Sequence, residues 1–232
     1  MARALCPLAT TVFALLVCSV LTGAQQPPAS PEASRVREAI TVLNEVMSVP
    51  ESSIPAAIAK RAEGIAIFPS TVKAGFIFGG MRGRGILSAR TAEGWSAPTF
   101  MTLTGGSVGL QIGGQATDIV LVIMNRRGLE HFVRNQFKFG ADASVAAGPV
   151  GRDAQANTDL QLLAEILSYS RARGLFAGVT INGSTVRADR DANERLYGKP
   201  LDGAQIVLDG IEVESPTPVA EWIQTLSRYA GR

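Results

Sequence analysis

Cysteine and histidine are nearly absent from this sequence of 232 residues. The two cysteines, Cys6 and Cys18, both lie within residues 1–24, and His131 is the single histidine. Without residues 1–24 the chain has no thiol, which excludes a disulfide, a thiolate zinc site and a cysteine nucleophile. The acidic residues do not have the spacing of a calcium-binding loop. We therefore expect no metal and no other cofactor.

A strong excess of one charge is also missing. The chain has 22 basic and 20 acidic residues, and residues 1–24 account for one base, Arg3, and no acid. Domains that bind nucleic acid carry a clustered surplus of basic charge. We therefore expect no nucleic-acid partner.

The first 24 residues have the pattern of a secretory signal peptide. The apolar run from Val12 to Leu21 is too short to span a membrane in the mature protein, and small residues follow it at 22–24. We expect cleavage after Ala24 and export to the periplasm or the extracellular space, with association with a membrane surface as a further option. Cys18 leaves a lipoprotein alternative open, although Val17 stands where that processing favours a small residue.

The 208 residues that follow are enough for one domain with a substantial core. We expect a linker at 25–34 and a single domain at 35–232. An apolar stripe at helical spacing predicts a helix over Glu32–Ser48, which overlaps the end of the linker. Near the other end of the chain, Thr217 and Pro218 are typical of a helix start, and a second apolar stripe follows them.

The middle of the chain has the pattern of a β-sheet. Glycine is concentrated between residues 64 and 114, which predicts tight turns and bulges. Asp118–Met124 is apolar, β-branched and short, and it predicts a buried central strand. The predicted fold class is α+β, with a strongly bent antiparallel sheet or partial barrel and flanking N- and C-terminal helices. Further predicted strands are Ile65–Phe68 closed by Pro69, Ala74–Phe78, Gly85–Ser88, Phe100–Leu103 and Gly178–Ile181.

One short motif is typical of hydrolases. Gly105–Gly109 matches G-x-S-x-G around Ser107, and Asp118 and His131 follow in the order of an α/β-hydrolase triad. The motif requires a helix directly after the serine, but residues 110–114 are unsuited to one. A glycine-rich β-turn explains the motif better, so we expect that the protein is not an enzyme.

Two basic clusters suggest an anionic ligand. Gly79–Gly85 alternates glycine with Arg82 and Arg84, so that backbone N–H groups and guanidinium groups could hold a phosphate. A hairpin turn with two solvated arginines is the alternative. Arg171 and Arg173 share a face if they lie on a strand, and apolar residues follow at 175–176. Basic groups beside apolar ones suit a lipid headgroup and its acyl chain, although a strand with one solvated face has the same pattern.

Several of these segments together resemble the SYLF domain family. The matching blocks occur in the family's order and cover about residues 35–229: Gly64–Phe78, Gly79–Gly85, Phe139–Arg152, Ile166–Gly178 and Leu196–Gly198. The resemblance implies a domain that binds phospholipids, with anionic phosphoinositides as the ligands of eukaryotic relatives. Some relatives also bind actin and carry SH3 or FYVE modules, neither of which we recognise in this sequence. For an exported member, anionic bacterial phospholipids are the expected substitute.

We therefore expect non-catalytic binding of an anionic phospholipid or membrane surface, with protein partners left open. The alternative is a structural or protein-interaction module of the cell envelope that has no lipid ligand. The headgroup contacts are chosen by charge and motif position, and the resemblance does not assign them: Lys73, Arg82, Arg84, Arg171 and Arg173.

Overall fold

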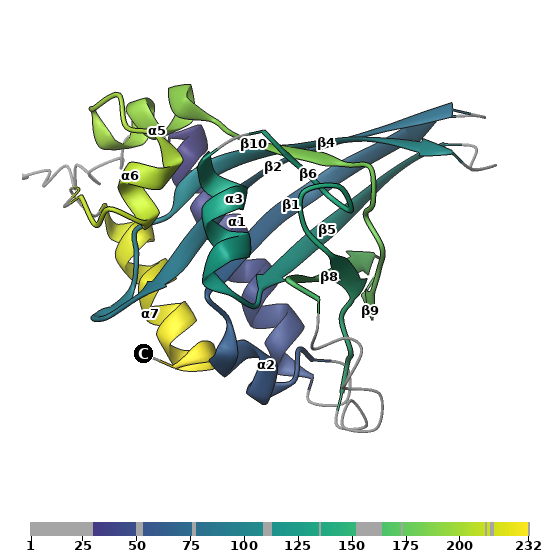
Figure 1. Ribbon diagram of the computed structural model, residues 1–232, viewed down its shortest axis with the longest axis horizontal. Coiled ribbons are helices and arrows are strands. Elements are labelled where there is room, and N and C mark those ends of the chain that lie inside the picture. The colour runs from purple at the N-terminus through teal and green to yellow at the C-terminus, as the bar shows by residue number, and fades with distance from the viewer. Residues whose placement is uncertain are drawn as a thin grey trace, which may run out of the picture.

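A computed structural model of the protein describes residues 30–49, 53–75, 78–108, 113–134, 136–151, 164–172, 174–211, 213 and 216–231. The predicted signal peptide and Arg173 lie outside these residues. Within them, one strongly curled, open sheet carries helices against both of its faces (Figure 1). The predicted α+β class and the bent sheet with N- and C-terminal helices are confirmed.

The sheet has the strand order β6-β10-β4-β2-β1-β5-β8-β7, while β3 pairs only with β2 and β9 only with β8. All strand pairs are antiparallel except β7 with β8. The helices are α1 (Pro31–Ser48), α2 (Ala56–Arg61), α3 (Arg126–Arg134), α5 (Arg190–Tyr197), α6 (Gly203–Val207) and α7 (Thr217–Ala230). The strands are β1 (Gly64–Gly75), β2 (Phe78–Thr91), β3 (Gly94–Trp95), β4 (Thr99–Val108), β5 (Gly113–Ile123), β6 (Phe137–Lys138), β7 (Val145–Ala147), β8 (Ile166–Ala172), β9 (Leu175–Gly178) and β10 (Thr185–Ala188).

The apolar run predicted as a central strand lies in β5. Its residues Ile119–Ile123 are completely buried, because the core on one face takes Val120 and Val122 and the core on the other takes the alternate residues. The four long strands β1, β2, β4 and β5 extend beyond the helices at one end of the molecule (Figure 1). The sheet therefore has a covered half, which holds the core, and a projecting half.

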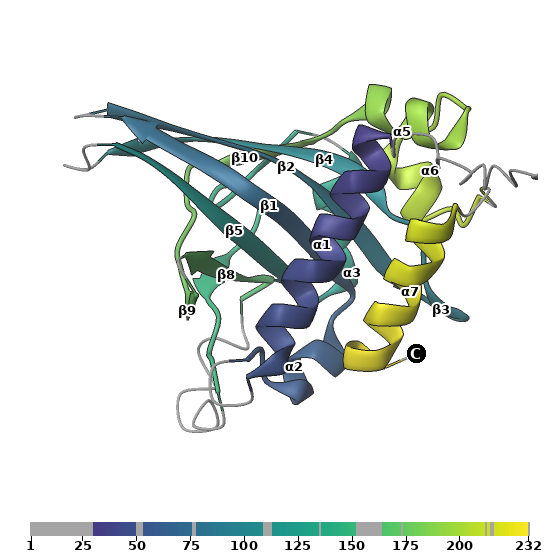
Figure 2. The same cartoon turned by 180° about the vertical axis from the view of Figure 1, so that it is seen from behind.

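On one face of the sheet, α1 and α7 lie side by side (Figure 2). The buried stripe of α1 includes Val36 and Leu43, as its helical spacing predicts. In α7 the indole of Trp222 is fully buried, and its Nε1 donates to Ser88 Oγ on β2 at 2.8 Å. This hydrogen bond satisfies the one polar atom of the largest side chain in this core.

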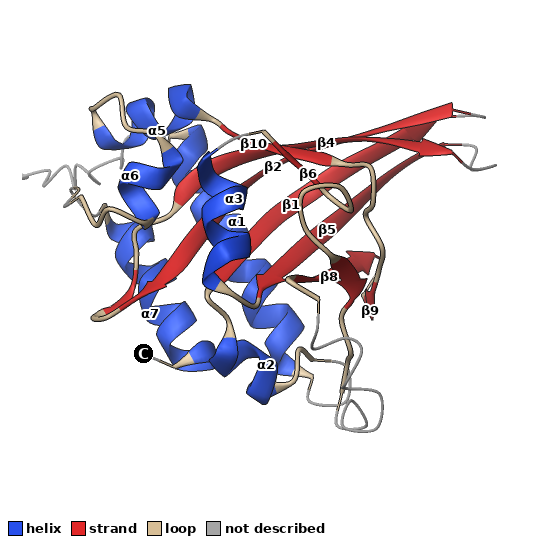
Figure 3. Cartoon of the chain, in the orientation of Figure 1, coloured by secondary structure: helices blue, strands red, loops and turns tan. Residues whose placement is uncertain are grey.

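On the opposite face, α3 and α6 pack against a second core (Figure 3). Three phenylalanines form its centre, with ring centroids 5.1 to 6.0 Å apart: Phe132, Phe137 and Phe139. At the sheet margin, α5 is attached to β4 through the buried amide of Asn193. Its Oδ1 accepts from the Phe100 backbone N–H at 2.8 Å, and its Nδ2 donates to Thr99 Oγ1 at 3.0 Å.

The predicted end of the first strand at Pro69 is wrong. β1 continues to Gly75 through a β-bulge, which shifts its register against both neighbouring strands. Proline, which has no N–H to donate, is tolerated in a strand at such an irregularity. The next residue, Ser70, has a φ of 47°, and its N–H donates to Asp118 Oδ1 at 2.9 Å. This bond fixes the bulge against β5.

Two other strand predictions are also wrong. Ala74–Phe78 is not one strand, because β1 ends at Gly75 and β2 begins at Phe78. Gly178–Ile181 is not a strand either, because β9 ends at Gly178. Local composition favoured extended backbone at both places but did not show where the chain reverses direction.

Candidate functional site

The segment Gly79–Gly85 is neither a phosphate-binding loop nor a hairpin turn. It lies inside β2, where every residue from 79 to 82 pairs with both β1 and β4. The glycines at 83 and 85 are required by close packing. A Cβ at Gly83 would clash with the Thr71 side chain, and a Cβ at Gly85 would clash with the Ile67 carbonyl oxygen and the Phe68 ring. Positions 83 and 85 thus point to the face of the sheet on which the bulged part of β1 comes close. Arg82 and Arg84 point to the opposite face.

This explanation predicts different effects for two glycines of the same strand. Gly85→Ala is expected to lower the free energy of unfolding by about 2 kcal/mol, because backbone must move to admit the methyl group. Gly80→Ala is the matched control, since a Cβ there meets nothing within 4 Å, and we expect a change of about 0.5 kcal/mol or less. Urea denaturation of both variants measures the difference. Equal effects would contradict the packing explanation.

Arg82 and Arg84 are exposed on the face of the sheet that α1 covers in part. Together with α1 they line a surface pocket of about 520 Å³, which we call the arginine pocket. Its walls are formed by Pro31, Arg35 and Glu38 of α1, Pro69, Ser70 and Val72 of β1, and Arg82, Gly83 and Arg84 of β2. Three arginines and one glutamate thus line one pocket.

Arg35 is the unusual member of the arginine pocket. Its side chain is only 8% exposed, and its Nη1 has no hydrogen-bond partner. The nearest counter-ion is Asp189 Oδ2, at 3.7 Å, and the guanidinium lies 5.1 Å from the Phe100 ring centroid. Burial lowers the pKa of Arg35 below its ordinary value, and the positive charge of Arg84 adds to this effect while Asp189 opposes it. Arg35 is thus a buried cation whose Nη1 faces the Asp189 carboxylate beyond hydrogen-bond distance.

The first turn of α1 is held in place by a second ion pair. Glu32 is 2% exposed, and its Oε1 accepts from Arg195 Nε of α5 at 2.7 Å. The carboxylate of Asp189, beside Arg35, also caps α5 by accepting from the Ala192 N–H at 3.2 Å. These contacts join α1 to α5 and so fix the position of Arg35 before any ligand binds.

Lys73 does not belong to the arginine pocket. The Cα partner of Lys73 is Met81, which lies in the core of the opposite face, whereas the Cα partner of Arg82 is Val72. Simple alternation from Ile67 would place Lys73 on the same face as Ile67. The bulge inserts one residue into β1, and a shift of one residue moves every following side chain to the other face.

Arg171 is on the same face as the arginine pocket but is already neutralised. Its Nε and Nη2 donate to Asp118 Oδ2 at 2.9 and 2.7 Å, and its Nη1 pairs with Glu45 of α1. The guanidinium therefore joins β8, β5 and α1. Of the five predicted headgroup residues, the structure brings only Arg82 and Arg84 together, and Arg173 lies outside the described residues.

Arg35 was not predicted as a site residue. It belongs to the polar side of the predicted helix, where exposure is the ordinary expectation. Its burial arises from α5, which begins more than 150 residues later in the chain. No local pattern could have shown that contact.

The hydrolase constellation is not assembled. Ser107 lies within β4, paired to Gly79, and not at the turn between a strand and a helix. The Asp118 carboxylate is engaged by Arg171 and the Ser70 N–H, and His131 is exposed on α3. Among the described residues there is no cluster of three metal-ligating His, Cys, Asp or Glu side chains.

The curled sheet, its helices and the arginine pocket define an α+β domain with a basic surface pocket. The chain belongs to the Ysc84 family, the family with the SYLF domain. The family model, described as "Las17-binding protein actin regulator", matches residues 104–229. The resemblance found in the sequence is therefore confirmed.

Three relatives show how much of the family's proteins this chain represents. It is 33% identical over 186 residues to Protein YSC84 of Saccharomyces cerevisiae, covering 78% of this chain and 39% of the relative. It is 34% identical over 203 residues to LAS seventeen-binding protein 3 of the same yeast, covering 86% and 43%. It is 30% identical over 206 residues to SH3 domain-containing YSC84-like protein 1 of Rattus norvegicus, covering 86% and 60%. The chain thus spans less than two thirds of each of these relatives.

Proposed function

We propose that this protein binds the phosphate of an anionic phospholipid headgroup in the arginine pocket, without catalysis. The observation that supports this most is the gathering of Arg35, Arg82 and Arg84 around one pocket, where Arg35 Nη1 comes no closer than 3.7 Å to the Asp189 carboxylate. A guanidinium matches the oxygens of a phosphate with two parallel hydrogen bonds.

The surroundings of the pocket favour a lipid at a membrane surface. Val72, on the pocket wall, is 52% exposed and offers an apolar contact next to the charged groups. The pocket has three arginines and one carboxylate, that of Glu38, and so an excess of positive charge. Each basic residue near an anionic membrane contributes about 1 kcal/mol of attraction. No helix in the described part of the chain is long and apolar enough to span a bilayer. The exposed Val72 and the excess of arginine over carboxylate support contact with the surface through this pocket.

We also propose that the protein acts after export through the predicted signal peptide, in the periplasm or outside the cell. The ligand would then be an anionic phospholipid of the envelope, as the resemblance to the SYLF family implies for an exported member. Lys73 and Arg173 remain predicted lipid contacts that are not part of the arginine pocket. Lys73 cannot share a headgroup with Arg82, because the two side chains lie on opposite faces of the sheet.

Sedimentation with vesicles tests the proposal. We expect the protein to bind phosphatidylcholine vesicles that contain phosphatidylglycerol and not vesicles of phosphatidylcholine alone. Arg82→Gln combined with Arg84→Gln is expected to reduce binding at least tenfold, because two phosphate contacts are lost.

The matched control removes the same charge elsewhere. Arg61→Gln combined with Arg127→Gln affects two exposed arginines outside the arginine pocket. We expect a reduction of about threefold or less from their general attraction to the surface. Equal losses in the two double variants would show non-specific attraction in place of a headgroup site.

A protein-binding function is the second candidate, supported by the description of the family and by the name of one relative, LAS seventeen-binding protein 3. We weigh it below lipid binding, because the described large apolar side chains that are exposed lie on separate segments: Val49, Val72, Leu175 and Ile211. Lipid-independent capture of one stoichiometric protein by wild type and by the Arg82, Arg84 double variant would favour this candidate.

A further inference from the structure

A second pocket lies at the margin of the sheet beyond β10, and we call it the edge pocket. Its volume is about 690 Å³, within the range of about 300–1,000 Å³ that is usual for small-molecule sites. Arg134 at the end of α3, Arg187 on β10 and Arg190 at the start of α5 all line it. Three separate elements therefore each contribute an arginine to the lining of one pocket.

The edge pocket is distinct from the arginine pocket. The two cavities share no lining residue. Thr102 of β4 pairs with Arg84 of β2 on one side and with Arg187 of β10 on the other. The three residues therefore form one row across the sheet, with the two arginines two strands apart. Thr102 itself is only 5% exposed, which means that the row is covered between them. A ligand in one pocket does not reach the other along this row.

The three arginines of the edge pocket are available to a ligand. In the described part of the chain, none of the three guanidinium groups makes a hydrogen bond or an ion pair. All three side chains are exposed. One of the two carboxylates in the pocket is already used, because Asp202 accepts from the Gln205 N–H at 3.0 Å as the cap of α6. Asp209 is the other carboxylate.

We propose that the edge pocket binds a phosphorylated sugar. The arginines supply the forked donors that a phosphate requires. Asp209 and the Gln136 amide can accept from sugar hydroxyl groups, which a bare anion does not have. The described lining includes no aromatic side chain, so the pocket offers no surface on which a nucleotide base could stack. The site is independent of lipid binding and can exist whether or not the arginine pocket holds a headgroup.

Isothermal titration with glucose 6-phosphate tests this proposal, with glucose and inorganic phosphate as the two fragments of the probe. We expect saturable binding of glucose 6-phosphate at one site, at least tenfold weaker binding of inorganic phosphate, and no binding of glucose. Arg134→Gln combined with Arg187→Gln is expected to weaken binding of glucose 6-phosphate at least tenfold. Arg61→Gln combined with Arg127→Gln is the matched control and is expected to bind as wild type does.

Each other outcome overturns the proposal. Absence of saturable binding removes the site, and equal binding by the edge-pocket and control variants removes the assigned arginines. Equal affinity for inorganic phosphate and glucose 6-phosphate removes the role of the hydroxyl contacts. The Arg82, Arg84 double variant is expected to bind the sugar phosphate normally, so failure of the lipid proposal and failure of this one are distinguishable.

Discussion

Arg90→Ala is expected to lower the free energy of unfolding by about 4 kcal/mol. The Arg90 guanidinium, on β2, donates to four backbone carbonyls at the ends of α2 and α7. The Nε donates to Ala62 O at 2.8 Å, and the terminal nitrogens donate to Lys60 O, Ala230 O and Gly231 O at 3.2, 3.0 and 3.3 Å. The last carbonyls of a helix have no partner within the helix, so the substitution leaves all four without this donor.

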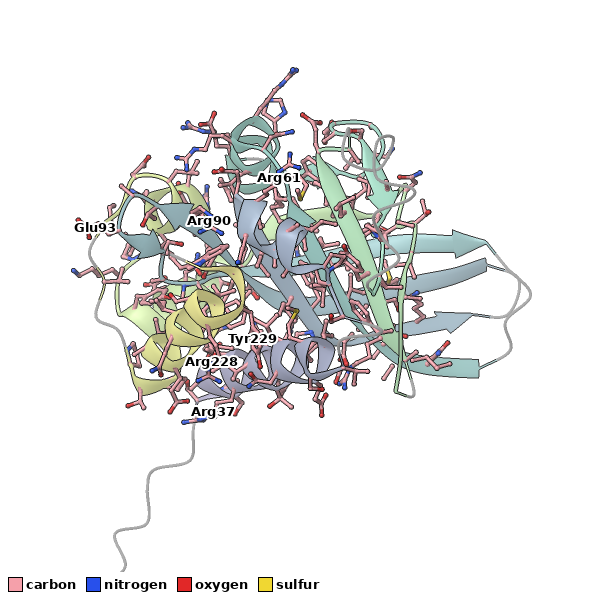
Figure 4. The ribbon with its side chains drawn as sticks, turned by 90° about the horizontal axis from the view of Figure 1, so that it is seen from below. Arg37, Arg61, Arg90, Glu93, Arg228 and Tyr229 are labelled. Atoms are coloured by element: carbon pink, nitrogen blue, oxygen red, sulfur yellow. The ribbon has the colours of Figure 1, made fainter. Side chains whose placement is uncertain are left out.

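Trp95 strengthens the same junction. Its ring centroid is 4.6 Å from the Arg90 guanidinium carbon, and its Nε1 donates to Gly231 O at 2.8 Å. The last turn of α7, which carries Arg228 and Tyr229, is thereby held against β2 (Figure 4). Loss of Arg90 would release the ends of two helices at once.

Urea denaturation with Arg61→Ala as control measures this effect. Arg61 is exposed, and we expect its substitution to change stability by about 0.5 kcal/mol or less. Arg90→Lys is expected to recover only a small part of the loss, because an ammonium group cannot reach four carbonyls with a planar fork. A loss in Arg90→Ala no greater than in the control would contradict the structural role of this residue.

Arg35→Met is expected to abolish binding to anionic vesicles while leaving the protein folded. Methionine retains an apolar stem over the Phe100 ring and removes a buried charge whose nearest ion-pair partner, Asp189, is 3.7 Å away. Replacement of a poorly compensated buried charge by an apolar group costs little, so the expected change in stability is within about 1 kcal/mol. Vesicle sedimentation and urea denaturation of the same preparation separate binding from folding.

Arg35→Lys completes that experiment. It keeps the positive charge but loses the fork, so partial binding is expected. Full vesicle binding by folded Arg35→Met would remove Arg35 from the site. If Arg35→Met fails to fold, the Arg82, Arg84 double variant still tests the arginine pocket, because both side chains are exposed.

Much of the fold was predictable because its signals are local. The stripe of α1, the apolar run in β5 and the proline-started helix α7 each depend on spacing within one segment. The structure adds one residue at the start of α1, which begins at Pro31. Such elements are specified by the burial of their own apolar residues.

Several of the differences from the sequence predictions arise from the bulge in β1. It lets the strand pass Pro69, it requires glycine at 83 and 85 of β2, and it moves Lys73 to the face opposite Arg82. A bulge depends on the pairing of three strands, and the sequence of one strand does not show it. The pair Arg82 and Arg84 was predictable from the sequence of one strand alone, because residues two apart share a face whenever their segment is extended.

The most direct test of the central claim is mass spectrometry of a solvent extract from protein purified under native conditions. The account predicts about one anionic phospholipid per chain in wild type and its loss in the Arg82, Arg84 double variant. Protein that carries no lipid and also fails to bind vesicles containing phosphatidylglycerol would contradict lipid binding in the arginine pocket.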